Sequence, residues 1–222
     1  MGIISLEHTD RLYWLGRYTE RVYTTLRLYT ERYDELIDAE PLAYQRFCTD
    51  LDIPDVYGSK ECFEEKYPFD TMDPNSIISN LNRAYDNAVV LREEIGSEVL
   101  SYIQLAIYDI QTAYSSKDML MGLQEVLDHI LAFWGIADDM IESEQVRNII
   151  KTGKRIERLD LYARLEMPAS YLIREVDRMR FRLERSGMDY KKSYVEDLIR
   201  LVKEEKIDYY RIVNEVETIL EV

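Results

Sequence analysis

The fold of this chain is decided by a short motif that occurs twice. The first copy is Gly16-Arg17-Tyr18-Thr19-Glu20-Arg21-Val22. The second copy is Gly153-Lys154-Arg155-Ile156-Glu157-Arg158-Leu159. A constant offset of 137 residues, from position 16 to position 153, also relates Arg27-Leu28 to Arg164-Leu165. Both copies lie in long segments with apolar residues at helical spacing, so the sequence predicts two helices of similar local structure.

Helical geometry gives the motif a defined face. At about 100° per residue, Gly16, Glu20 and Arg27 lie within about 40° of one face, and the second copy repeats this arrangement. A glycine inside a helix costs about 1 kcal/mol relative to alanine. Its missing side chain lets another helix or a ligand approach closely, and the sequence leaves open which of them does.

The two motif helices are predicted to pack as pseudo-twofold mates. Glu20 would then face Arg158 or Arg164 of the second copy, and Glu157 would face an arginine of the first copy, Arg21 or Arg27. Two interpretations stay open. One is a buried ion-pair network that fixes the helix register. The other is a polar site that binds an anionic or zwitterionic ligand or performs acid–base chemistry.

The second interpretation names specific candidates. Glu20 and Glu157 are the candidate catalytic residues, as acid–base or amine-binding groups. The candidate ligand-binding residues all belong to the two motifs and are Gly16, Arg17, Arg21, Arg27, Gly153, Arg158 and Arg164. The arginines would hold a carboxylate or phosphate.

The rest of the chain is also predicted to be helical. Asp73-Pro74 is a helix-start signal and Gly187 a stop signal. Helices are expected at residues 9–36, 74–95, 97–114, 116–140, 143–166, 169–186, 190–204 and 207–221. No convincing alternating strand pattern occurs. The prediction is an all-α, multi-helix bundle with one continuous core, forming a single domain over residues 1–222.

Composition excludes several classes of protein. The 222 residues include 28 Lys+Arg and 43 Asp+Glu, for a net charge of −15, which opposes nucleic acid or an anionic membrane surface as partner. The longest clean apolar stretch, residues 130–137, is too short to span a bilayer. Two cysteines, Cys48 and Cys62, make no disulfide framework. Without a signal-peptide pattern, the expected compartment is the cytoplasm.

The negative charge is concentrated in one segment. Between Glu31 and Asp73 there are 13 acidic and 4 basic residues, so nine of the 15 excess negative charges lie there. Residues 37–73 are therefore expected to form an acidic, solvated excursion from the domain. Short helices near 41–50 and 60–66 are expected within it.

Other chemistry finds little support in the sequence. Glu125 and His129 share a helix face, but a second histidine-bearing helix is missing, so no metal site is predicted. Glycine-rich phosphate loops are absent, and no cofactor is predicted. The 18 tyrosines are expected at the edge of the core, with a tyrosine-lined groove for a peptide or partner as the alternative.

The motifs also resemble a known family. Trp14-Leu15-Gly16-Arg17-Tyr18-Thr19-Glu20-Arg21, the second motif, and Asn87-Ala88, Arg92-Glu93 and Ser97-Glu98 between them are similar to the alpha-E family. This is a bacterial all-helical domain named for a conserved Glu-Arg motif. The resemblance covers residues 10–166, with a shifted Ser-Glu spacing, and is less clear in residues 37–73 and in the last fifty residues.

The resemblance implies a functional context. Members of the family are encoded beside, or fused with, circularly permuted ATP-grasp proteins and transglutaminase-like proteases. A partner of either kind, and a peptide or small anionic ligand, are therefore implied, in a system that forms or modifies amide bonds. The alternative is a non-catalytic adaptor whose Glu-Arg motifs form a structural ion-pair network. The sequence leaves open whether the protein is an enzyme.

Overall fold

The structure is a computed structural model that describes residues 4–33 and 43–220. Apart from an isolated bridge between Tyr190 and Leu220, all regular secondary structure in these residues is helical. The prediction of an all-α fold is confirmed. The helices are α1 (Leu6–Glu31), α3 (Ala43–Leu51), α4 (Lys60–Lys66), α5 (Ile77–Val90), α6 (Arg92–Ile95), α7 (Ser97–Tyr114), α8 (Met119–Met140), α9 (Glu144–Arg164), α10 (Ala169–Ser186), α11 (Lys192–Leu201) and α12 (Tyr209–Glu217).

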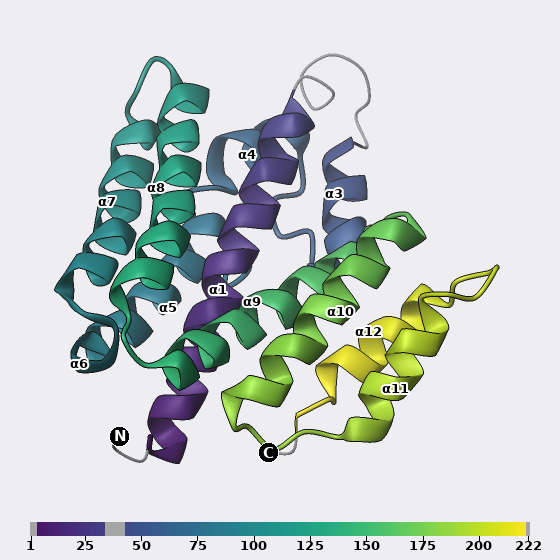
Figure 1. Ribbon diagram of the computed structural model, residues 1–222. Coiled ribbons are helices and arrows are strands. Elements are labelled where there is room, and N and C mark those ends of the chain that lie inside the picture. Colours follow the sequence, from purple (N-terminus) through teal and green to yellow (C-terminus); the bar gives the residue numbers. More distant parts are fainter. Residues whose placement is uncertain (1–3, 34–42, 221–222) are drawn as a thin grey trace.

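The two motif helices form the centre of the molecule (Figure 1). Helix α1 packs against α9, and the two cross. Helices α5 and α8 pack on α1, and α7 pairs with α8 as a hairpin. On the other side α10 and α12 pack on α9, and α11 contacts both of them. Every other layer is therefore arranged around the α1–α9 pair.

Local capping explains where the helices begin. The side chains of Ser5, Asp118 and Ser143 accept hydrogen bonds from the first-turn amides of α1, α8 and α9. The expected start at Asp73-Pro74 is wrong, because Ser76 caps α5 instead. The Asp73 carboxylate accepts hydrogen bonds from the Asn75 amide through one oxygen and from the Tyr57 hydroxyl through the other, each at 2.8 Å, but residues 74–75 form a turn and the helix begins after Ser76.

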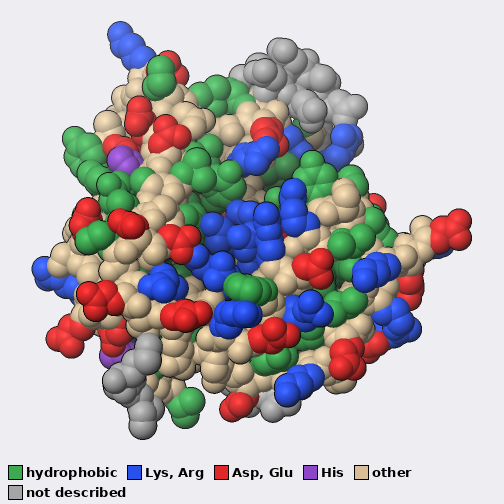
Figure 2. All heavy atoms as spheres, in the orientation of Figure 1, with side chains coloured by type: hydrophobic (Ala, Val, Ile, Leu, Met, Phe, Trp, Pro, Cys, Tyr) green, Lys and Arg blue, Asp and Glu red, His purple; other side chains and the backbone are tan. Residues whose placement is uncertain are grey.

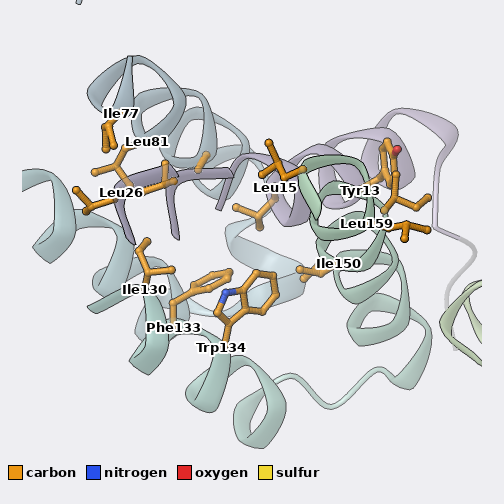
Figure 3. Close-up of a cluster of buried hydrophobic side chains, with 14 of the residues drawn as sticks. Tyr13, Leu15, Leu26, Ile77, Leu81, Ile130, Phe133, Trp134, Ile150 and Leu159 are labelled. Carbon is orange, nitrogen blue, oxygen red and sulfur yellow. The ribbon is translucent and has the colours of Figure 1, made fainter. Parts of the chain in front are cut away.

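One buried core runs through the molecule (Figure 3). Leu15 and Leu26 of α1 belong to this core together with Ile77 of α5 and with Ile130 and Phe133 of α8. All five side chains are fully buried. Burial of apolar area is favourable by roughly 25 cal/mol per Å², so these residues help to hold α5 and α8 against α1.

The segment after residue 42 differs from the solvated excursion that its charge predicts. The expected short helices are present as α3 and α4, but their aromatic side chains are buried. Phe47, Phe63 and Tyr67 surround Tyr29 of α1, with ring centroids 6.1–6.4 Å from it. Acidic and aromatic residues occur together in these short helices, so the charge composition of the segment does not reveal that its aromatic side chains are buried. Residues 34–42 of the segment lie outside the described part of the chain.

No helix in residues 4–33 and 43–220 combines the length and the apolar character needed to cross a membrane.

Candidate functional site

Two glycines let the motif helices touch backbone to backbone. A Cβ atom at Gly16 would lie 2.0 Å from the backbone oxygen of Ile150, and one at Gly153 would lie 2.1 Å from that of Tyr13. A helix backbone therefore occupies the space beside each glycine, which answers the question left open by the sequence. The equivalent positions of Gly16 and Gly153 confirm the predicted pseudo-twofold packing.

Glu157 is held by two arginines of the opposite helix. Arg17 Nε donates to Glu157 Oε2 at 2.6 Å, and Arg21 Nε donates to Glu157 Oε1. The Glu157 side chain is fully buried. Burial raises the pKa of this carboxyl, but the guanidinium groups of Arg17 and Arg21 outweigh burial and bring it below its usual value. Glu157 is therefore an ionised, fully paired group.

Glu20 occupies the equivalent position on the other side of the crossing. Arg158 Nε donates to Glu20 Oε1 at 2.6 Å, and the Thr24 hydroxyl donates to the same oxygen at 3.0 Å. Glu20 is also fully buried, and its Oε2 atom finds no hydrogen-bond partner among the described residues. The predicted exchange of ion pairs between the two copies is confirmed by Arg158–Glu20 and Arg21–Glu157.

The ion-pair clusters around Glu157 and around Glu20 differ at one position. Lys154 is the counterpart of Arg17, and its ammonium lies 3.7 Å from the centroid of the Trp134 ring. Burial and the nearby positive charges lower the pKa of Lys154 to about 7, although Glu20 acts in the opposite direction. Figure 2 shows Lys and Arg side chains gathered at the middle of one face, over the region where α1, α9 and α10 come together.

Arginines line a cleft on the Glu157 side of the crossing. The cleft has a volume of about 520 Å³ and is lined by Arg17, Arg21, Arg83 and Arg164, and we refer to it as the arginine cleft. Trp14 and Tyr18 line it as well, as do three carboxylates that pair with its arginines, Asp52, Asp160 and Glu217. Neither Glu20 nor Glu157 reaches its surface, since both are fully buried. The motif thus presents guanidinium groups to the cleft and keeps its glutamates behind them.

Arg164 is fixed by three carboxylates from three parts of the chain. Its Nε donates to Asp160 at 3.0 Å, and its two terminal nitrogens donate to Asp52 at 2.8 Å and to Glu217 at 2.6 Å. Asp160 is buried, and burial together with the Glu157 carboxylate raises its pKa above the usual range. Arg164 therefore joins α9 to α12 and to the residue that follows α3.

The candidate residues separate into groups. Arg17, Arg21 and Arg164 meet at the arginine cleft, whereas Arg158 is paired with Glu20. Arg27 lies apart from both: its side chain is 56% exposed and pairs with Glu31 at 2.7 Å. Among the described residues, no carboxylate from another helix pairs with Arg27 in the way that Asp52 and Glu217 pair with Arg164.

Sequence reasoning did not find Arg83, which comes from α5. In the described part of the chain it forms no ion pair. Its guanidinium donates to the backbone oxygen of Pro74 at 2.8 Å and lies 5.7 Å from the centroid of the Tyr18 ring. No repeat or motif marks this residue, because only tertiary packing brings α5 beside α1. Groups of three or more His, Cys, Asp or Glu side chains suited to a metal ion are absent from the described residues.

A family of known proteins shares the Glu-Arg motif at the centre of the site. The model of the Alpha-E family, a predicted alpha-helical domain with a conserved ER motif, matches residues 8–200. Both Glu-Arg pairs of the crossing lie within this range. No curated protein and no solved structure matches the chain. Because the family model covers most of the chain and both motifs, this protein belongs to the Alpha-E family.

Proposed function

We propose that the arginine cleft binds a small ligand or peptide through a carboxylate or other anionic group. The observation that carries the proposal is the presence of four arginine side chains around one cleft of about 520 Å³. Clefts of roughly 300–1,000 Å³ are typical of small-molecule sites. The planar guanidinium fork suits a carboxylate or phosphate better than other groups do.

Arg21 and Arg83 are the two arginines whose guanidinium groups are the most available to a ligand. Arg21 uses its Nε for Glu157, and its side chain remains 31% exposed. Arg83 makes no ion pair within the described residues, and its ring contact with Tyr18 leaves it at the cleft. Arg17 and Arg164 are largely committed to carboxylates. In this proposal Glu157 positions two of the guanidinium groups, and the acid–base role of Glu20 and Glu157 stays a prediction.

The wider context of the proposal comes from the family resemblance. The ATP-grasp and transglutaminase-like proteins associated with the family handle amide bonds and substrates that bear carboxylates. We therefore propose that the ligand belongs to an ATP-grasp-linked system that forms or modifies peptide or amide bonds. The adaptor alternative is supported by the complete burial and pairing of Glu157, which a purely structural network also explains.

A binding experiment separates the two functions. The probe is N-acetyl-dialanine with a free carboxylate, compared with the same peptide as its C-terminal amide, by calorimetry on the full chain. We expect the carboxylate to bind and the amide not to bind. Arg83→Gln should weaken binding about fivefold, which is what the loss of one partly exposed charge contact of about 1 kcal/mol gives.

Arg200→Gln is the matched control. Arg200 lies on α11 with 58% of its side chain exposed, and it is not among the residues that line the arginine cleft. It should leave binding unchanged. If the carboxylate and the amide bind equally, or neither binds, the ligand-binding function is refuted and the adaptor function is favoured.

A further inference from the structure

A second cleft adjoins the arginine cleft and is lined mainly by acidic residues among its charged side chains. It has a volume of about 480 Å³ and is lined by Asp50, Asp52, Glu166 and Glu217, and we refer to it as the acidic cleft. Three residues line both clefts: Asp52, Arg164 and Glu217. The two clefts are therefore neighbours that share the Arg164 ion-pair cluster as their boundary.

The residues of the shared boundary are already paired with one another. Each of the three nitrogens of the Arg164 guanidinium already donates to a carboxylate, so Arg164 offers no free charge to an anion, and the three carboxylates around this single cation leave the boundary negative. The unpaired charges lie further out on each side. Arg83 lines the arginine cleft and not the acidic one, whereas Glu166 lines the acidic cleft and not the arginine one. Neither forms an ion pair within the part of the chain that the structure describes.

The acidic cleft has further features that favour a cation. Tyr209 and Tyr210 line it, and Tyr210 is 85% exposed, so its ring is available to an ammonium group. Asp52 and Glu166 also have left-handed backbone, with φ of 54° and 48°, and they are the two such non-glycine residues among those described. This conformation closes the ends of α3 and α9, since the amides of Ile53 and Met167 donate to the backbone oxygens of Cys48 at 3.0 Å and Tyr162 at 2.9 Å. The acidic cleft therefore lies at two helix C-termini, whose dipoles favour a cation.

Building on the proposed function, we propose that the two clefts together form one groove for a short peptide with both ends free. The peptide carboxylate would bind in the arginine cleft beside Arg83. The chain would pass over the Arg164 ion-pair cluster, and the terminal ammonium would bind in the acidic cleft beside Glu166. The unpaired charges of Arg83 and Glu166, one at each end, set the direction of the peptide.

The test uses tetra-alanine in four forms: with both ends free, N-acetylated, C-amidated, and capped at both ends. Binding to the full chain is measured by calorimetry. We expect the peptide with free ends to bind about fivefold more tightly than either singly capped form, because each cap removes one charge contact. The doubly capped form should show no measurable binding.

Two variants assign each end of the peptide to a cleft. Glu166→Gln should weaken binding of the free peptide about fivefold and leave the N-acetylated peptide unaffected. Arg83→Gln should weaken the free and N-acetylated peptides and leave the amidated one unaffected. Arg200→Gln again serves as the control. Thermal melting establishes that each variant is folded, and the comparison of peptides on the unmodified chain remains informative if a variant is not.

The outcomes separate this inference from the function on which it rests. If free and N-acetylated peptides bind equally and Glu166→Gln has no effect, the peptide groove is refuted while the anion site in the arginine cleft stands. If no peptide with a free carboxylate binds, both are refuted. Equal loss of the free and N-acetylated peptides on Glu166→Gln would also overturn the proposed direction.

Discussion

Replacing Gly153 with alanine tests the backbone contact that holds the site together. The added Cβ would lie 2.1 Å from the backbone oxygen of Tyr13 and 3.0 Å from the backbone nitrogen of Arg17. Ordinary contacts begin at 3.4 Å, so the first distance is 1.3 Å too short. Because both obstructing atoms are backbone, no side-chain rotation relieves the overlap, and α1 and α9 must separate.

Two opposing effects set the magnitude of the change. Overpacking of a close-packed contact costs about 1–3 kcal/mol, and the rigid backbone here places Gly153→Ala at the upper end. Alanine is favoured over glycine inside a helix by about 1 kcal/mol. The expected net result is a loss of about 2 kcal/mol in the free energy of unfolding. Gly16→Ala should behave alike, since its Cβ would lie 2.0 Å from the backbone oxygen of Ile150.

The assay is urea unfolding followed by far-ultraviolet circular dichroism, with Gly135→Ala as the matched control. Gly135 is also inside a helix, α8, but a Cβ there would meet nothing within 4 Å. This control should gain up to about 1 kcal/mol. The reasoning fails if Gly153→Ala is as stable as the original chain while Gly135→Ala shows the expected gain.

Two further predictions concern the ionised groups. Glu157→Ala leaves the guanidinium groups of Arg17 and Arg21 without their buried partner, so it should lower the free energy of unfolding by about 3–5 kcal/mol. The same urea titration measures this loss. A loss below about 1 kcal/mol would contradict a structural role for the ion pairs of Glu157. Lys154→Met removes an amine whose pKa falls from 10.5 to about 7 in the folded state. Below pH 7 the buried charge destabilises the fold fully, and the penalty disappears as the pH rises toward 10.5. The stability of the original chain relative to Lys154→Met should therefore rise between about pH 7 and pH 10, and equal pH profiles would contradict the burial of this amine.

The sequence predicts the central helix pair well because the evidence for it is periodic. Helical spacing identifies the long helices, and the 137-residue offset identifies which residues face each other. Both ion pairs, Arg158–Glu20 and Arg21–Glu157, could therefore be predicted from the sequence. Which side of the crossing opens to a cleft depends on α5, α12 and the residues after α3. Tertiary packing places these neighbours, and the repeated motif does not predict that packing.

The errors have physical causes of the same kind. Asp73-Pro74 has the local features of a helix start, but Asp73 accepts hydrogen bonds from the Asn75 amide and the Tyr57 hydroxyl in a turn, and the helix begins later, after Ser76. Charge counting marks the region around α3 and α4 as solvated, because an average over a segment conceals aromatic residues on one face of a short helix. Arg83 could not be predicted, since nothing in its local sequence differs from that of a surface arginine.

The carboxylates behind the arginine cleft affect how much conformational entropy a ligand must remove. Glu157 holds Arg17 and Arg21, and three carboxylates hold Arg164, so these side chains are ordered when the chain folds. Ordering a flexible side chain on binding otherwise costs about 0.5–1.5 kcal/mol. On binding, a ligand would have to order chiefly the side chain of Arg83. Most of the favourable contact energy of even a small anion would therefore contribute to its affinity.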